Sequence, residues 1–158
     1  MDLVFQNGLH ESGDSGLVAE VSRALEMESF LHVKTQHLAK GQLQRSIIGL
    51  SLLYGSRIIM MDEPVFALEE GQKDRVFEYL LAYSRSRKVP LYYTVHNLDL
   101  SRKYSDFMLL FTKEGGFSVG TTGDMFTRER IEEAFHAPMD TLHQRDSLYR
   151  ELLLKNLE

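Results

Sequence analysis

The chain has 158 residues, of which 43% are hydrophobic, enough for the core of one domain of ordinary size. Lysine and arginine number 18 against 23 aspartate and glutamate residues, giving a formal net charge of −5. Because nucleic-acid-binding domains usually carry a basic excess, this balance argues against a dedicated nucleic-acid binder. The sequence contains no cysteine, which excludes disulfides, thiolate metal sites and cysteine nucleophiles. Its most apolar stretch, 47–61, is interrupted by polar residues and glycine, so it is too short for a transmembrane helix.

The first half of the chain is expected to be mostly helical. Apolar residues at helical spacing predict a helix over 17–31. A second helix begins after Gly41, and because its second half is apolar nearly all round, we expect it to be buried. A glycine–serine pair ends that helix. The short apolar run 57–61, which is bounded by breakers, then predicts a buried strand.

The second half alternates helices and strands. The expected elements are a helix over 69–87, a strand over 91–95, a helix over 98–104, strands over 107–111 and 117–119, and helices over 127–135 and 141–157. The strand over 117–119 follows a tight glycine turn, so it should lie at an edge and pair antiparallel. The alternation of strands and helices predicts an α/β layered fold with parallel central strands and right-handed crossovers.

Two carboxylates, Asp62 and Glu63, follow the strand expected over 57–61. In open α/β sheets, ligands bind beyond the carboxyl ends of the strands. One carboxylate there can hold Mg²⁺, directly or through water, and the next can accept a proton from an attacking water. Taken alone, the same pattern also fits a helix N-cap followed by a solvated acid.

Three other motifs accompany this acidic pair, and together they resemble the C-terminal half of an ABC-type ATPase over about residues 3–135. The segment Leu38-Ala39-Lys40-Gly41-Gln42-Leu43-Gln44-Arg45 resembles the end of the family's signature motif. Residues 58–63 resemble the Walker B strand. Ala67-Leu68 matches the D-loop and His96 the switch histidine.

The resemblance implies a partial P-loop-NTPase-type fold, a mostly parallel sheet with flanking helices plus part of a helical subdomain. Residues 1–37 would be the remnant of the helical subdomain. Residues 38–136 would be the signature, Walker B and switch-histidine part of the core, and 137–158 a C-terminal helix. The opening Asp2-Leu3-Val4 and residues 120–135 most resemble the metal-chelate importer branch, which serves siderophores, haem and cobalamin.

The resemblance also implies ATP and Mg²⁺ as cofactors and assigns roles to the acidic pair. Asp62 would hold magnesium, Glu63 would be the general base, and His96 would contact the γ-phosphate or orient the attacking water. By itself, His96 also fits a hydrogen-bonded histidine at a strand end.

The helix that begins near Gly41 is the second place where a nucleotide is expected. A helix N-terminus presents free N–H groups and the positive end of a dipole to a phosphate, and Lys40 adds a cation. In the family, this motif faces nucleotide bound by the opposite subunit. The resemblance therefore implies that Lys40, Gly41 and Gln42 contact the nucleotide of a second ABC ATPase subunit.

The partners implied by the resemblance are that second subunit, in a homo- or heterodimer, and a transmembrane permease, with no nucleic acid. The expected reaction is ATP hydrolysis coupled to solute uptake. The expected location is cytoplasmic, peripheral on the inner face of the cell membrane through the permease.

The sequence departs from the family pattern in the signature motif and around the D-loop. Ala39 stands where serine is usual and Lys40 where glycine is usual, so a hydroxyl that would bond phosphate is missing. Phe66 replaces a common serine, and Glu69 replaces the usual aspartate of the D-loop. These departures predict weaker hydrolysis across a dimer.

No Gly-x-x-x-x-Gly-Lys-Ser/Thr motif occurs in the sequence. The nearest match, over 8–15, has Asp14 in the lysine position, and Glu11 adds a second negative charge that would repel phosphate. We therefore expect the P-loop to lie upstream of Met1 and the lone chain to be inactive.

Two alternatives to the ATPase subunit remain. The first is a non-catalytic interaction module that docks on a full-length ABC ATPase or permease. The second is a chromosome-maintenance or repair ATPase head, which the acidic balance and the short segment between the strands and the C-terminus disfavour.

Overall fold

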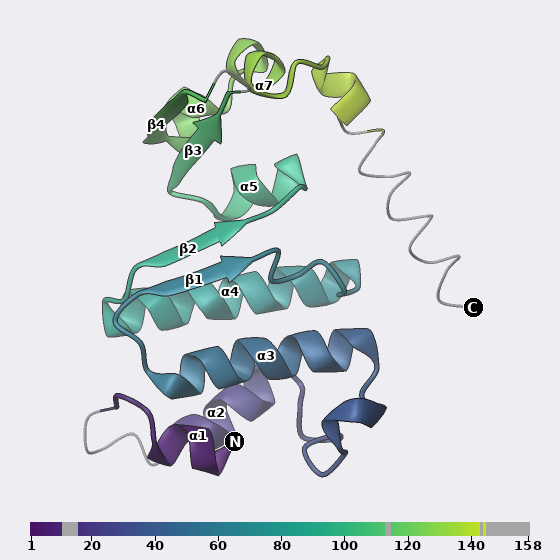
Figure 1. Ribbon diagram of the computed structural model, residues 1–158, viewed down its shortest axis with the longest axis vertical. Helices are drawn as coiled ribbons and strands as arrows, with labels where there is room; N and C mark the ends of the chain where they lie inside the picture. Colours follow the sequence, from purple (N-terminus) through teal and green to yellow (C-terminus); the bar gives the residue numbers. More distant parts are fainter. Residues whose placement is uncertain (11–15, 113–114, 143, 145–158) are drawn as a thin grey trace. The chain divides into compact units, whose positions relative to one another are not determined.

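The computed structural model describes residues 1–10, 16–112, 115–142 and 144. The chain forms two compact units, Met1–Val95 and His96–Glu158. Both units combine helices with a two-stranded sheet (Figure 1), so the expected α/β composition is confirmed. The three segments expected at 1–37, 38–136 and 137–158 stay a prediction.

The first unit contains a parallel sheet of two strands. Its elements are α1 (Asp2–Gln6), α2 (Leu17–Ala24), η1 (Thr35–His37), α3 (Lys40–Tyr54), β1 (Ile59–Asp62), α4 (Glu70–Arg87) and β2 (Leu91–Thr94). The strands pair from Ile59 opposite Leu91 to Asp62 opposite Thr94. Because α4 forms the crossover between the strands, they can run in the same direction, as predicted.

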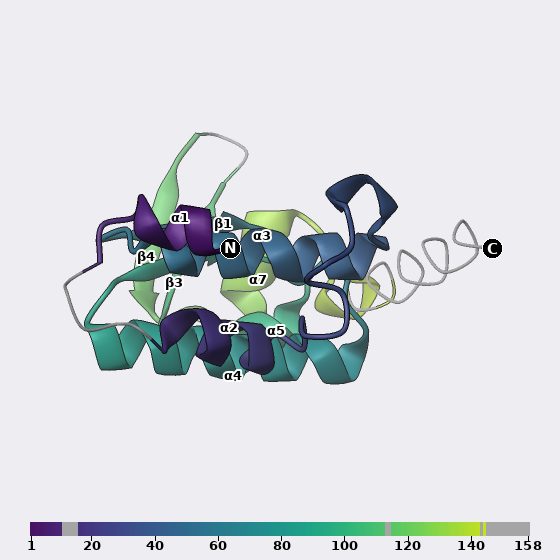
Figure 2. The same ribbon diagram turned by 90° about the horizontal axis from the view of Figure 1, so that it is seen from below.

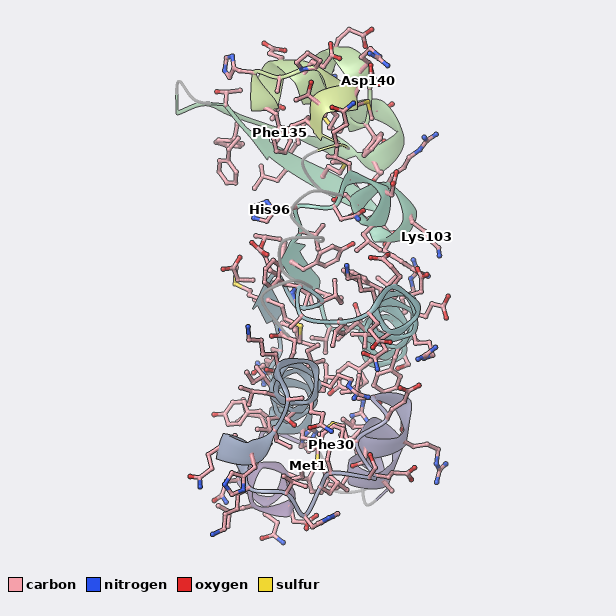
Figure 3. The ribbon with its side chains drawn as sticks, turned by 90° about the vertical axis from the view of Figure 1, so that its right-hand side faces the viewer. Met1, Phe30, His96, Lys103, Phe135 and Asp140 are labelled. Atoms are coloured by element: carbon pink, nitrogen blue, oxygen red, sulfur yellow. The ribbon has the colours of Figure 1, made fainter. Side chains whose placement is uncertain are left out.

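The core of the first unit lies between its helices and one face of this sheet. Helix α3 contacts α1 and α2, and α4 contacts α2 and β2 (Figure 2). The ring of Phe77 on α4 packs against Tyr93 on β2 at 4.9 Å between centroids. Met1 and Phe30 lie among the N-terminal helices (Figure 3). The buried apolar side chains include Leu17, Val21, Leu25, Phe30, Ile48, Leu52, Leu53, Ile59, Val76, Phe77 and Leu80.

The helix expected over 17–31 is shorter than predicted, because it ends at Ala24. Glu26 adopts a left-handed conformation with φ +51°, and the Met27 N–H donates to Ser22 O at 2.8 Å. The following residues therefore enter the core from a turn instead of a continued helix. A P-loop follows a strand, but the residues before the segment 8–15 form the helix α1. The segment therefore lacks the structural context of a P-loop. Residues 11–15 of that segment lie outside the described residues.

Two expectations of complete burial are wrong. Ile47 on α3 is 50% exposed, and Met60 on β1 is 77% exposed. Residues alternate between the two faces of β1, and among the described residues the helices cover only one of these faces. The apolar pattern of each segment predicted its element correctly but could not tell how many of its sides are covered.

The second unit is built on an antiparallel hairpin. Its elements are α5 (Leu98–Tyr104), β3 (Phe107–Phe111), β4 (Phe117–Thr121), α6 (Thr122–Met125) and α7 (Arg128–Phe135), with a further helical turn at 139–142. The predicted antiparallel pairing is confirmed, with Phe107 opposite Thr121 and Phe111 opposite Phe117. Its core comprises Leu98, Met108, Leu110, Met125 and Ile131. Most of the helix expected over 141–157 lies outside the described residues.

Candidate functional site

The acidic pair lies at the carboxyl end of β1, where the sequence placed it. Asp62 is the last residue of the strand and is opposite Thr94 of β2. The Thr94 hydroxyl donates a hydrogen bond to Asp62 Oδ1. Both residues are exposed. The Asp62 carboxylate is therefore oriented at the edge of a parallel sheet, the usual place for a ligand in such sheets.

Glu63 turns the chain sharply away from the sheet. Its φ is +45°, a left-handed conformation that a residue with a side chain adopts at a cost of about 1 kcal/mol. The Glu63 N–H lies within 3.2 Å of Thr94 O and 3.1 Å of Thr94 Oγ1. The Glu63 carbonyl accepts from the Phe66 N–H at 3.2 Å. The second acid thus leaves the strand on a turn that β2 holds in place.

Asp62 could contribute one ligand to a magnesium ion that also binds a substrate. Thr94 occupies Asp62 Oδ1, which leaves Oδ2 for another ligand. Among the described residues, no group of three or more histidine, aspartate or glutamate side chains could form a cage for a metal. Magnesium is commonly bound by one or two carboxylates together with water and phosphate oxygens, so a complete protein cage is not required.

The N-terminus of α3 forms the second part of the candidate site. The Ala39 N–H donates to Gln42 Oε1 at 3.0 Å, which is one half of a capping box. The Ala39 side chain has no acceptor for the other half. The Lys40 side chain is exposed. The Gln42 side chain is therefore engaged in the helix cap, whereas the first N–H groups of α3 have no acceptor within the helix.

The signature-like helix and the D-loop-like turn are in close contact at Gly41. A Cβ atom at position 41 would lie 3.1 Å from Ala67 O and 3.6 Å from Leu68 Cδ2. Leu68 is buried, and its N–H donates to Val65 O at 3.1 Å. A side chain at position 41 would push these segments apart, so glycine allows two motifs that are distant in sequence to pack directly.

Arg45 anchors this helix to the turn after α2, a role that the sequence did not reveal. Its side chain is buried, and Nη1 donates at 3.0 Å to both Leu25 O and Glu26 O. The guanidinium lies 5.1 Å from the centroid of the Phe30 ring. Burial lowers the pKa of Arg45, and the Glu26 carboxylate opposes this shift. The sequence feature that could have indicated this role is a charged residue within a helix that was expected to be buried.

Glu26 also connects this anchor to α4. Its Oε1 pairs with Arg75 Nε at 2.9 Å, while its Oε2 lies 3.4 Å from Arg45 Nη1. One carboxylate thus bridges two arginines from two helices. The left-handed conformation of Glu26 is held by the groups that its side chain and carbonyl contact.

His96 begins the second unit, directly after the strand β2 and the residue that follows it. Its side chain is exposed and projects from the ribbon (Figure 3). The next residue, Asn97, caps α5, because its Oδ1 accepts from the Leu100 N–H at 2.8 Å. The predicted role of His96 at a γ-phosphate stays a prediction.

Thr94 is a residue of this site that the sequence reasoning missed. The strand containing Thr94 was predicted, but its partner and register were not. Parallel strands that end together place their last residues side by side, so pairing this strand with the one that ends at Asp62 would have indicated the contact.

Comparison with curated proteins identifies relatives of the chain. It is 29% identical over 140 residues to the molybdenum import ATP-binding protein ModC of Hahella chejuensis, covering 85% of this chain and 39% of ModC. It is 30% identical over 132 residues to the hypophosphite import ATP-binding protein HtxD of Stutzerimonas stutzeri, covering 84% of this chain and 38% of HtxD. The chain thus spans less than half the length of either relative.

The fold is shared with a solved transporter structure. An inward-facing conformation of a putative metal-chelate type ABC transporter matches 87% of this chain and 57% of that chain, with a TM-score of 0.70 and 23% identity. No established family model matches the sequence. The chain is thus similar in sequence to part of the import ATP-binding proteins, and its fold is that of an ABC ATPase cassette.

Proposed function

We propose that the chain contributes the signature, Walker B and switch-histidine elements of an ABC-type importer ATPase, in which ATP hydrolysis drives solute uptake. The observation that carries this proposal is the acidic pair, Asp62 and Glu63, at the carboxyl end of β1. The relatives are import ATP-binding proteins, which supports the same activity.

The residues of the site have distinct roles in this proposal. Asp62 would hold Mg²⁺, directly or through water, and the bound ion would neutralise phosphate charge. The Glu63 carboxylate accepts the proton of the attacking water. His96 donates to the γ-phosphate. Thr94 keeps Asp62 oriented through its hydroxyl.

In this proposal, the N-terminus of α3 contacts the nucleotide that a second ATPase subunit holds. The N–H groups of Lys40, Gly41 and Gln42 face the phosphates of ATP held by that subunit, in a homo- or heterodimer. The exposed Lys40 ammonium adds a positive charge.

The remaining partner in this proposal is a transmembrane permease, which holds the ATPase at the cytoplasmic face of the membrane. In the part of the chain that the structure describes, none of the helices has the length and apolar character that a bilayer-spanning segment needs.

The lone chain is proposed to be inactive, because a P-loop supplies most of the phosphate contacts. ATP hydrolysis is measured for the chain alone and after mixing with a P-loop-containing ABC polypeptide. We expect turnover only in the mixture, lost in Glu63→Gln and retained in Glu78→Gln, which removes an exposed charge from α4. Turnover near one per second by the chain alone, lost in Glu63→Gln, would contradict the proposed inactivity.

A non-catalytic interaction module is the second candidate function. The observation that favours it is the cap of α3, where Ala39 provides no hydroxyl and the Gln42 side chain bonds the backbone. If this candidate is correct, the chain changes the ATPase rate of a full-length ABC ATPase, and Glu63→Gln leaves that effect unchanged.

The class of solute that is taken up is a separate proposal. Resemblance of the sequence to the metal-chelate branch supports a metal chelate, whereas the two curated relatives import molybdenum and hypophosphite. Uptake of radiolabelled ferric siderophore and of molybdate, in cells with and without the gene, separates these classes.

A further inference from the structure

We propose that Thr94 is a positioning residue that holds both acids of the site, Asp62 through its side chain and Glu63 through its backbone. The Thr94 hydroxyl donates to Asp62 Oδ1 and lies 3.1 Å from the Glu63 nitrogen, whose N–H it accepts. A hydroxyl has one proton to donate and two lone pairs to accept with, so it makes both bonds at once.

The strand register explains why residue 94 occupies this place. Asp62 and Thr94 are directly opposite in the parallel pair, and both side chains lie on the exposed face of the sheet. Threonine is β-branched, so its χ1 angle is restricted and the hydroxyl direction is held. Valine at the same position keeps this shape without the hydroxyl, whereas serine keeps the hydroxyl without the methyl group.

The turn at Glu63 gives the second half of the argument. The Glu63 N–H has two acceptors, Thr94 O at 3.2 Å and Thr94 Oγ1 at 3.1 Å. The residue adopts φ +45°, which a side chain disfavours. Because both acceptors belong to Thr94, this residue fixes the Glu63 N–H at the point where the chain leaves the strand, while the Phe66 N–H bonds the Glu63 carbonyl.

The consequence for a cation rests on the proposed function. With Oδ1 bonded to Thr94, Oδ2 of Asp62 is left as the oxygen that can bind a cation. Partners that orient a metal ligand commonly change metal affinity about 10- to 100-fold when they are removed. Because this pair is exposed, we expect an effect near the lower end, roughly tenfold.

The positioning role is tested first without metal. Amide hydrogen exchange at Glu63 is measured by NMR in the chain and in Thr94→Val, Thr94→Ser and Thr35→Val, the last removing an exposed hydroxyl elsewhere. We expect exchange at Glu63 to rise several-fold in Thr94→Val only. Thr94→Ser should stay within about twofold of the unmodified chain, since it keeps the hydroxyl. Unchanged exchange in Thr94→Val would overturn the positioning role.

The cation role is tested with Mn²⁺ alone, by paramagnetic broadening of NMR signals. We expect broadening at Asp62 and Glu63, with roughly tenfold more Mn²⁺ needed in Thr94→Val than in Thr94→Ser. Equal Mn²⁺ requirements in these two variants would overturn the effect on the cation. Absence of broadening at Asp62 in the unmodified chain would overturn the proposed magnesium site itself, while the exchange result still decides the positioning role.

Discussion

The two faces of the β1–β2 sheet differ in what covers them, because one packs against α4 and the other is exposed. One face holds Ile59 and Tyr93, and the Tyr93 ring packs against Phe77 of α4. The other face presents Met60, Tyr92 and the Asp62–Thr94 pair to solvent. Stability is therefore concentrated on the covered face, and the candidate chemistry lies on the open one.

The largest difference is expected in the free energy of unfolding, when one side chain on each face is truncated. Phe77 is fully buried, so Phe77→Ala should lower the free energy of unfolding by about 3–5 kcal/mol. Met60→Ala, on the open face, should change it by less than about 0.5 kcal/mol. Denaturant titration followed by circular dichroism measures both. Similar losses for the two variants would mean that the open face is also packed in solution.

The Arg45 anchor should give the next largest effect. Arg45→Met leaves the carbonyls of Leu25 and Glu26 without a buried donor, which should cost about 2–3 kcal/mol. Arg75→Met is the matched control, because Arg75 pairs with the same Glu26 from an exposed position and should cost under about 1 kcal/mol. Equal costs in the same denaturation experiment would show that burial of Arg45 contributes nothing beyond its ion pair.

These contrasts show what the sequence could and could not predict. Local patterns indicated the strands and most helices, and the end of a strand indicated the position of Asp62. The end of α2 at Ala24 could not be predicted in this way, because the turn at Glu26 is held by Arg45 from another helix. Similarly, the partner of Asp62 depends on the pairing of two strands, which no local pattern contains. The exposure of Met60 could not be predicted either, because it depends on which faces of the sheet the helices cover.

The open face should also promote association between molecules. Exposed apolar side chains on a sheet favour self-association, and Met60 and Tyr92 lie side by side on this face. We expect oligomers of the unmodified chain in sedimentation experiments. Replacing both residues by lysine should weaken association about tenfold or more, since like charges repel. A monodisperse monomer at high concentration, before any substitution, would contradict this prediction.

Stability at high pH should depend on Tyr79, a residue of α4, the helix that packs on the covered face of the sheet. Its hydroxyl donates to Glu20 Oε1 at 3.0 Å. Burial, followed by this hydrogen bond, raises the pKa of Tyr79. Its contribution is therefore complete below the unfolded pKa of about 10 and is lost as pH rises above it.

The test compares the unmodified chain with Tyr79→Phe. The phenylalanine variant should be about 1 kcal/mol less stable at pH 8, and the difference should shrink as pH rises above 10. Unfolding curves of the two proteins, recorded at pH 8 and above pH 10, measure this difference in stability. A difference that stays constant with pH would show that the hydroxyl does not resist ionisation in the folded state.

The smallest expected effect concerns where inorganic phosphate binds. The acidic pair repels an anion unless a cation neutralises it, whereas the N-terminus of α3 offers N–H groups and the Lys40 ammonium. We expect weak phosphate binding that shifts the Gly41 amide signal in NMR titrations. Lys40→Glu should weaken it roughly fivefold, because it reverses a charge at the positive end of the helix dipole. Asp62→Asn removes a negative charge and should leave binding unchanged or slightly tighter. The opposite order, with Asp62→Asn abolishing a magnesium-dependent signal, would mean that the open face already forms a working half-site, and the interaction-module candidate would lose most of its support.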